Sequence, residues 1–320
     1  MKKTAIGKTG VSVTPIGFGT SGLGSMPDTY GYAVDEERAY ATVNAIFDGP
    51  VNLLDTSRNY GLGRSEERVG EVIRQRGGIP DGFVISTKLD RDMDTRILDA
   101  ARARASFEES LKALNLQKVQ ILHLHDPEHC ANLEDITKPG GALDELFKIK
   151  EEGLADAVGL AMGTIDIMFP MLRSRPFDCL ITHNRYTLLN REAEEMMQYA
   201  ADVGIAVFNA APFSGGVLAK GADHMKRITY QEANEEMLAP VRQIETICGD
   251  MGVSPAAAAL QFSLRDERVA STIVGVSKAD RVQQTLDWAN ETISEDAWEA
   301  LEAVPYTTGN PEANRVYKPG

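Results

Sequence analysis

The stretch that decides the fold is Val51-Asn-Leu-Leu-Asp-Thr-Ser-Arg-Asn-Tyr-Gly61, in which a short apolar run leads into a carboxylate, a tyrosine and a turn. The apolar run predicts a buried strand at 51–54, and the glycines at 61 and 63 predict a turn. Asp55 therefore stands where a strand ends, and Tyr60 lies in the loop after it. A carboxylate buried there needs a cationic partner, because an unpaired buried charge is costly.

Further short apolar runs of the same kind recur along the chain, each followed by a segment with helical periodicity. The predicted strands are 15–20, 51–54, 83–88, 119–125, 155–160, 177–182, 205–209 and 271–275. The predicted helices are 35–48, 65–75, 101–114, 142–151, 164–173, 190–202, 236–250, 254–264, 278–289 and 294–302, with an insertion at 212–234. Continuous apolar runs are typical of parallel strands covered on both faces. Eight strand–helix units favour the α/β class and one closed (β/α)8 TIM barrel.

An open doubly wound sheet is the alternative, but its G-x-G-x-x-G fingerprint after the first strand is absent. Residues 1–14 predict an N-terminal hairpin around a glycine-bounded turn, and the chain ends in a C-terminal helix and a tail. The tail, 304–320, carries Tyr306, Arg315 and Tyr317, and either folds over the strand ends or packs loosely. Without a linker or a longer repeat, residues 1–320 are expected to form a single domain.

The composition excludes several classes of partner. A formal net charge of -14 disfavours binding to nucleic acids and to anionic membranes. The three cysteines, Cys130, Cys179 and Cys248, are scattered, so neither a disulfide framework nor a zinc knuckle is indicated. The N-terminus has no signal-peptide h-region, and no apolar run approaches the ~18 residues of a membrane span. A cytoplasmic protein is expected, and nothing indicates its oligomeric state.

Four residues that could carry chemistry gather at the ends of three successive predicted strands: Asp55 with Tyr60 in the loop after it, Lys88, and His125. Barrel enzymes keep catalytic groups at these strand ends, and adjacent strands lie about 5 Å apart, so the four side chains are expected to converge. Lys88 would neutralise Asp55 and stabilise the Tyr60 phenolate, lowering its pKa from about 10. His125 would donate a hydrogen bond to a substrate oxygen. The set predicts proton transfer around a tyrosine.

Each of these residues also has a purely structural interpretation: a barrel ion pair, a packed loop tyrosine and a core histidine. A separate alternative is a metal-dependent hydrolase, because His123 and His125 point the same way on a strand. We expect no metal site, since the chain has only five histidines and His123 is expected one layer deeper in the barrel.

On these residues the chain resembles the aldo-keto reductase superfamily, over nearly its whole length. The resemblance rests on Gly17-Phe-Gly-Thr20, Asp55-Thr-Ser-Arg-Asn-Tyr-Gly61, Ser86-Thr-Lys88 and His125-Asp-Pro127. It implies a (β/α)8 barrel that binds a nicotinamide cofactor without a Rossmann domain. It also implies catalytic roles for Asp55, Tyr60, Lys88 and His125.

Several further segments resemble the bacterial branch named for D-threo-aldose 1-dehydrogenase, or L-fucose dehydrogenase, to which pyridoxal 4-dehydrogenase is similar. These segments are His125-Asp-Pro-Glu128, Gly159-Leu-Ala-Met-Gly163, His183-Asn-Arg-Tyr-Thr-Leu-Leu-Asn190 and Asn209-Ala-Ala-Pro-Phe213. The branch implies hydride transfer between NADP or NAD and C1 of an aldose. Reduction of a sugar-like aldehyde, or a pyridoxal 4-dehydrogenase-like activity, is the nearest alternative. A regulatory barrel that only binds the nucleotide is another, and the complete tetrad argues against it.

The resemblance also implies a cofactor-binding set. Ser214-Gly-Gly-Val-Leu218 resembles the loop over the pyrophosphate, and Arg281 falls where the family places an arginine on the 2′-phosphate. The chain departs from the common pattern at Ala161, Met162, His183, Ala210 and Gly275. The implied cofactor residues are Gly19, Thr20, Asp55, His183, Pro212, Phe213, Ser214, Gly216, Leu218, Gly275, Ser277, Lys278, Arg281 and Gln284.

The substrate residues are expected to be Tyr60 and His125 together with two charged neighbours, Asp126 and Arg58. Glu128 and Asn59 are expected to face the same mouth. Charged side chains there suit a small hydroxyl-rich ligand, most simply a sugar. The alternative is that they are solvated loop charges.

Overall fold

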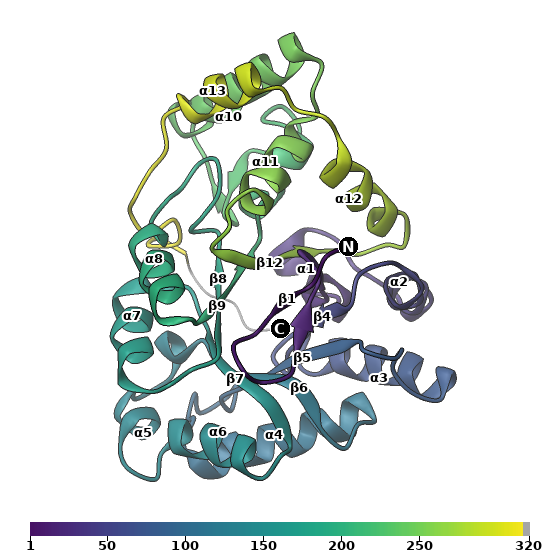
Figure 1. The fold of residues 1–320 in the computed structure, drawn as a ribbon, viewed down its shortest axis with the longest axis vertical. Helices are drawn as coiled ribbons and strands as arrows, with labels where there is room; N and C mark the ends of the chain where they lie inside the picture. The colour runs from purple at the N-terminus through teal and green to yellow at the C-terminus, as the bar shows by residue number, and fades with distance from the viewer. Residues whose placement is uncertain (316–320) are drawn as a thin grey trace.

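The computed structural model describes residues 1–315, and its centre is a closed barrel of eight strands (Figure 1). The strands are β3 (Ile16–Gly19), β4 (Leu53–Asp55), β5 (Val84–Leu89), β6 (Val119–His125), β7 (Ala155–Ala161), β8 (Cys179–His183), β9 (Ala206–Ala210) and β12 (Val269–Gly275). All neighbours in the barrel are parallel, and the last strand pairs with the first, Thr272 lying opposite Ile16. This closure confirms the predicted (β/α)8 barrel and excludes the open sheet.

Ten longer helices of the described chain match the predicted segments, and most of them surround the barrel in Figure 1. They are α2 (Glu36–Asp48), α3 (Arg64–Arg76), α4 (Ala100–Leu114), α6 (Ala142–Glu151), α7 (Ile165–Ser174), α8 (Glu194–Val203), α10 (Glu235–Met251), α11 (Pro255–Leu264), α12 (Asp280–Asn290) and α13 (Glu295–Glu302). Asp35 caps α2 by accepting a hydrogen bond of 2.8 Å from Arg38 N, and Glu36 and Glu37 occupy the first turn, where the helix dipole favours anions.

The helix predicted at 65–75 begins one residue earlier, at Arg64, and its cap position is Gly63, which makes no side-chain cap hydrogen bond. Ser65, the first residue of the predicted range, does not cap the helix. The Ser65 hydroxyl instead donates to Thr20 O over 2.9 Å and contacts Thr20 Oγ1 at 2.8 Å. Ser65 therefore fastens the helix start to the end of β3.

Several short elements were too brief for a periodicity argument. They are η1 (Ser21–Gly24), α1 (Pro27–Tyr30), η2 (Pro127–His129), α5 (Glu134–Thr137), η3 (Ser214–Gly216) and α9 (Val217–Lys220). The predicted insertion also contains a small hairpin of β10 (Arg227–Ile228) and β11 (Gln231–Glu232). Of these segments, η1, α1, η3, α9 and β10 contribute residues to the cavity described below, so they matter for binding more than for the fold.

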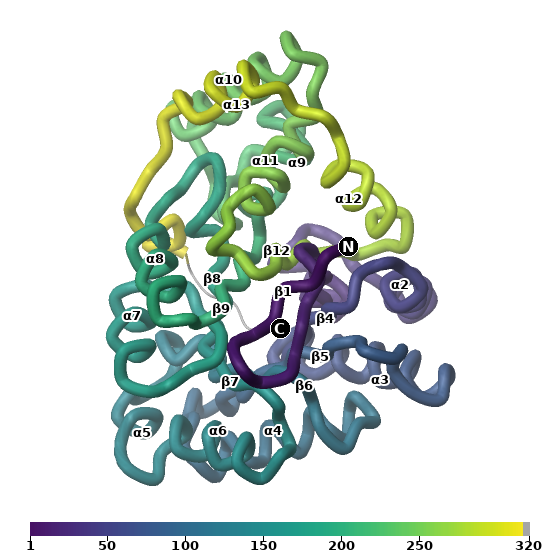
Figure 2. Tube along the Cα trace, viewed as in Figure 1, coloured from purple at the N-terminus to yellow at the C-terminus, as the bar shows by residue number. Residues whose placement is uncertain are grey.

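Two apolar cores hold the barrel together. The larger lies between the strands and the helices, and the smaller fills the barrel interior. The predicted N-terminal hairpin, β1 (Thr4–Ala5) with β2 (Ser12–Val13), belongs to the smaller core and crosses the barrel opening in Figure 2. Ile6, Val11 and Val13 pack there with residues from the first halves of the strands, such as Leu53 and Val84. The hairpin thus covers the N-terminal end of the barrel and leaves the other end for chemistry.

Within residues 1–315 we find no helix that combines the length and the apolar character needed to cross a membrane.

The close packing of α3 against α4 can be tested by its effect on stability. A Cβ added at Gly70 would lie 1.8 Å from the backbone oxygen of Ala113. We expect Gly70→Ala to lower the free energy of unfolding by about 1–3 kcal/mol, because backbone atoms of α4 would have to move. Gly249→Ala is the matched control: a Cβ in α10 meets nothing within 4 Å, so it should be neutral or stabilise by up to about 1 kcal/mol. Equal denaturation midpoints for the two variants would contradict the close packing.

Candidate active site

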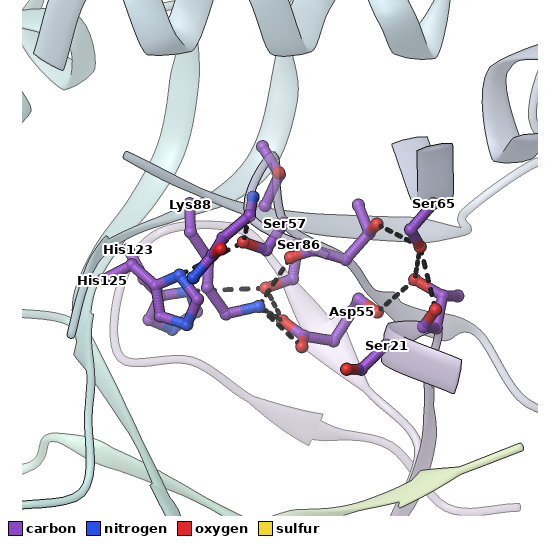
Figure 3. A network of polar contacts seen from close by, with 12 residues as sticks. Ser21, Asp55, Ser57, Ser65, Ser86, Lys88, His123 and His125 are labelled. Atoms are coloured by element: carbon purple, nitrogen blue, oxygen red, sulfur yellow. Dashed lines mark hydrogen bonds and ion pairs between the residues drawn. The ribbon is translucent and has the colours of Figure 1, made fainter. Parts of the chain in front are cut away.

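Alternation along the strands decides which side chains enter the barrel. On β5, Val84 belongs to the interior core and Ile85 to the outer one, so Ser86 and Lys88 point inward. On β6 the same rule turns His123 and His125 inward. Lys88 and His125 lie nearest the carboxyl ends of their strands, and Ser86 and His123 lie two residues deeper. Figure 3 shows these side chains gathered with Asp55 in one polar network.

A buried ion pair forms the centre of this site. Lys88 Nζ donates to Asp55 Oδ1 and Oδ2 over 2.8 and 2.7 Å, and to the backbone oxygen of Thr56 over 2.6 Å. Ser86 Oγ donates to Asp55 Oδ1 over 2.8 Å. Asp55 and Lys88 are almost fully buried. The ammonium group thus has three acceptors from the chain, and the pair is electrically neutral as a whole.

Tyr60 stands between this pair and His125. Lys88 Nζ lies 4.9 Å from the centroid of the Tyr60 ring, and the Tyr60 and His125 rings meet edge to face, with centroids 5.8 Å apart. Burial, followed by the Asp55 carboxylate, raises the pKa of Tyr60 well above its usual value. The expectation that Lys88 lowers this pKa is therefore wrong for the structure, because Asp55 already neutralises the ammonium group. Tyr60 keeps its proton at neutral pH.

His125 has a carboxylate partner that the sequence analysis missed. Its Nδ1 lies 2.5 Å from Asp90 Oδ1 and 3.1 Å from Ser57 Oγ. Burial alone would lower the pKa of His125, but Asp126 and Asp90 outweigh it and raise the pKa above the usual value. Asp90 was not among the candidates, because the predicted strand, 83–88, stops two residues before it. The available signal was its spacing: Asp90 follows Lys88 by two residues, and β5 continues through Leu89.

His123 lies beneath the tetrad and has no exposed surface. Its Nδ1 lies 3.3 Å from Ser86 Oγ and its Nε2 3.5 Å from Cys179 Sγ. Burial, helped by Lys88, holds the pKa of His123 well below its usual value, so this histidine is neutral. In residues 1–315 no three or more His, Cys, Asp or Glu side chains gather in a way that could hold a metal ion.

The four predicted catalytic residues share the wall of one cavity of about 480 Å³, a size typical of ligand sites. The cavity runs from the tetrad to the segment after β12. Of the predicted cofactor and substrate residues it is lined by Gly19, Asp126, His183, Pro212, Phe213, Gly216, Gly275, Ser277, Lys278 and Arg281. Asn59 and the departing positions Ala161, Met162 and Ala210 also line it.

Four predicted cofactor residues do not line the cavity: Thr20, Ser214, Leu218 and Gln284. Thr20 Oγ1 donates to Asp55 O over 3.1 Å, and Ser214 Oγ donates to Thr187 Oγ1 over the same distance. Leu218 is buried in the outer core, and Gln284 accepts a hydrogen bond from Arg281. These residues support the lining from behind, because their side chains are already engaged by the chain.

Arg58, predicted to contact substrate, does not face the mouth either. Its guanidinium lies 3.5 Å from Glu66 and 3.2 Å from Glu67, both on α3. Glu128 is engaged as well: its Oε1 accepts from the backbone N–H groups of Gly163 and Thr164 over 2.8 and 3.0 Å. Arg58 and Glu128 do not face the mouth because each binds to the start of a neighbouring helix. Residue spacing along the chain does not reveal such contacts.

The cavity wall is cationic, although the chain as a whole is acidic. Within residues 1–315, seven basic side chains line it against two acidic ones, Asp55 and Asp126: Arg38, Lys88, Lys220, Arg227, Lys278, Arg281 and Arg315. Arg38 was missed by the sequence analysis. It comes from α2, and its Nε donates to Ser277 O over 2.5 Å. Polar proton-transfer groups near Tyr60 and cations around Ser277 fit a nicotinamide dinucleotide, which carries a redox ring and phosphates.

The tail folds over the strand ends as far as residue 315. Glu312 Oε2 lies 2.8 Å from Arg185 Nη1 and 3.4 Å from His183 Nδ1, and Glu312 Oε1 accepts from Arg315 over 2.6 Å. Arg315 lines the cavity, whereas Tyr306 is exposed. Tyr317 lies outside the described residues.

Comparison with known proteins identifies the family. The model of the aldo/keto reductase family matches residues 15–305. The chain belongs to the aldo/keto reductase family. Membership confirms the predicted superfamily and makes the protein an oxidoreductase that uses a nicotinamide cofactor.

Named relatives cover most of the chain. It is 28% identical to pyridoxal 4-dehydrogenase from Microbacterium luteolum, with 94% of this chain and 96% of that protein covered. It is 29% identical to D-threo-aldose 1-dehydrogenase from Pseudomonas sp, with 91% and 94% covered, and 29% identical to L-galactose dehydrogenase from Arabidopsis thaliana, with 88% and 86% covered. A holo-form aldo-keto reductase from Bacillus halodurans superposes with a TM-score of 0.78 over 99% of this chain and all of its own, at 19% identity, which shows a shared fold.

The buried pair can be tested by removing one charge. Lys88→Met leaves the Asp55 carboxylate buried without a cation, so we expect a loss of about 3–5 kcal/mol in the free energy of unfolding at neutral pH. The double variant Asp55→Asn with Lys88→Met removes both charges and should recover much of that loss. Denaturant unfolding measures both. A Lys88→Met variant as stable as wild type would contradict the burial of the pair.

Proposed function

We propose that the protein transfers a hydride between a nicotinamide cofactor and C1 of an aldose or a similar polar carbonyl compound. The observation that supports this most is that Tyr60 and His125 meet above the neutral Asp55–Lys88 pair in the wall of one cavity. A phenol and an imidazole that are 5.8 Å apart, centroid to centroid, can both reach one substrate oxygen.

In carbonyl reduction the Tyr60 hydroxyl gives its proton to the substrate oxygen, and His125 donates a hydrogen bond to the same atom. Aldose oxidation is the reverse step: the deprotonated form of Tyr60, a phenolate, accepts the proton of the C1 hydroxyl as the hydride leaves C1, and the product is a lactone. When bound, the nicotinamide cofactor supplies or accepts the hydride. The raised pKa of Tyr60 keeps its acid form populated at neutral pH, which suits the reductive direction.

The cofactor would be held by the residues that line the rest of the cavity. Gly19, Gly216 and Gly275 have no side chain, so the cofactor could approach the backbone closely there. His183 also lines the cavity and would be a partner for the carboxamide. Ser277, Lys278 and Arg281, next to Arg38, would hold the adenosine phosphates of NADP or the ribose of NAD. Arg281 is the residue we expect to discriminate between the two.

Substrate polarity is supported by Asp126. It lines the cavity beside His125; burial opposes its ionisation, but the neighbouring histidines hold its pKa at about 2. An ionised carboxylate in the wall can accept hydrogen bonds from sugar hydroxyl groups. The relatives named as dehydrogenases of D-threo-aldoses and L-galactose agree with this choice. Pyridoxal is the second candidate, favoured by the aromatic rings of Tyr30 and Tyr230 in the same wall.

A substrate panel and one variant test the function together. Wild-type protein is mixed with NAD or NADP and with L-fucose, L-galactose, other aldoses or pyridoxal, and the nicotinamide absorbance is followed. We expect turnover of at least one aldose. Tyr60→Phe should lower kcat by about a hundredfold or more, because it removes the transferred proton. Its cofactor affinity, read from fluorescence quenching, should stay close to that of wild type.

Two outcomes would contradict the proposal. Normal cofactor binding without turnover of any compound in the panel would favour a nucleotide-binding regulatory barrel. Full activity of Tyr60→Phe would remove the tyrosine from the mechanism.

Cofactor choice gives a separate prediction. Arg281→Ala removes a cation from the Ser277 end, so the dissociation constant for NADP should rise about tenfold, as expected for one lost hydrogen bond between charged groups. The dissociation constant for NAD should change little. Arg265→Ala, a surface arginine that pairs with Glu302, is the control and should leave both unchanged. Equal weakening of the two cofactors by Arg281→Ala would contradict the assignment.

A further inference from the structure

We propose that Asp90 is a positioning residue for His125: its carboxylate keeps a proton on Nδ1 and leaves Nε2 as the ring nitrogen that faces substrate. Only the kinetic consequence rests on the proposed function. The position of the proton and the charge of the ring are properties of the chain itself and can be measured without a substrate.

Both oxygens of Asp90 are committed to this arrangement. Oδ1 lies 2.5 Å from His125 Nδ1, while Oδ2 accepts from Ser57 Oγ over 2.6 Å and from Asn59 N over 2.9 Å. The Ser57 hydroxyl has a single proton, which it donates to Asp90 Oδ2. An ionised carboxylate only accepts hydrogen bonds, so the proton between Asp90 and His125 must belong to Nδ1.

Asp90 is itself held rigidly. Its side chain is almost fully buried, its backbone N–H donates to Ser106 Oγ on α4 over 2.9 Å, and Arg102 of the same helix donates to its backbone oxygen over 3.3 Å. Burial opposes its ionisation, but the His125 charge and the hydrogen bonds from His125, Ser57 and Asn59 outweigh this and keep the pKa of Asp90 below its usual value. The carboxylate is therefore a fixed negative charge at the back of the imidazole.

The other carboxylate near His125 does not compete for this role. Asp126 Oδ2 lies 3.6 Å from Nε2, beyond hydrogen-bond distance, so Nε2 remains available to a ligand in the cavity. The titratable groups that face His125 come from several elements: Lys88 and Asp90 from β5 and the loop after it, Tyr60 from the loop after β4, His123 and Asp126 from its own segment, and His129 from η2.

A proton fixed on Nδ1 has a chemical consequence. Nε2 then carries a proton only when the ring is an imidazolium, so His125 donates to a carbonyl oxygen only in its charged form. Raising the pH through the pKa of His125 removes that donor. Because a neighbouring negative charge favours the charged ring, Asp90 extends the pH range in which the donor is present.

The experiment is a pH titration of the ring nitrogens by ¹⁵N NMR in the full chain. The five histidines make the spectrum assignable, and His125→Gln identifies the signal. In wild type, neutral His125 should carry its proton on Nδ1. Asp90→Asn should lower the pKa of His125 by about one unit or more, a tenfold fall in proton affinity. Asp94→Asn, an exposed aspartate in the same loop, should change nothing.

The kinetic readout follows the same ring. In Asp90→Asn the alkaline fall of kcat for carbonyl reduction should move to lower pH by the same amount, with KM little changed, and Asp90→Glu should restore part of the wild-type profile. A merely structural role would lower activity without moving the profile.

Several results would overturn the inference. One is a pKa of His125 that is equal in wild type and in Asp90→Asn. Another is a neutral His125 that carries its proton on Nε2 in the wild-type protein, a result that does not depend on whether the variant folds. A shifted His125 titration without turnover of any carbonyl compound would keep the inference and reject the proposed function.

Discussion

The buried ion pair of Asp55 and Lys88 is the constraint on which the rest of the site depends. Each charge would be costly alone, so the ends of β4 and β5 must meet where Lys88 Nζ reaches both carboxylate oxygens at 2.7 and 2.8 Å. The pair is neutral as a whole, and therefore it organises the mouth without imposing a net charge on it. Burial, followed by the Asp55 carboxylate, raises the pKa of Tyr60, so this residue keeps its proton although its ring lies against the ammonium group.

A second contact repeats the first, two residues further along both segments. Asp55 ends β4 and Lys88 lies in β5, whereas Ser57 and Asp90 lie in the loops that follow these strands. Asp55 pairs with Lys88, and Ser57 pairs with Asp90. The first contact, seen between Lys88 and Asp55 in Figure 3, neutralises a carboxylate, and in the second Asp90 holds His125. Tyr60 lies between the two. The stretch from the end of β4 to Tyr60 thus supplies three groups: the ion-pair partner Asp55, the hydrogen-bond donor Ser57 and the proposed acid Tyr60.

The sequence predicted most of the fold, because strands buried on both faces are continuous apolar runs and the helices keep one apolar face. It also predicted that Asp55, Tyr60, Lys88 and His125 converge, because strand ends meet in a barrel. It did not predict Asp90, which lay just beyond the strand boundary. Arg58 was misplaced because its acidic partners lie on a helix start, and a raised pKa of Tyr60 depends on burial. The direction of a loop side chain and its burial depend on tertiary contacts, which the spacing of residues along the sequence does not encode.

The central claim is that hydride leaves or reaches C1 of a sugar next to Tyr60. An aldose deuterated at C1, incubated with the wild-type protein and oxidised cofactor, tests it most directly. Mass spectrometry should find the deuterium on the reduced nicotinamide ring and a lactone that carries none. Reduced cofactor without deuterium, or deuterium that remains on the sugar product, would contradict the account.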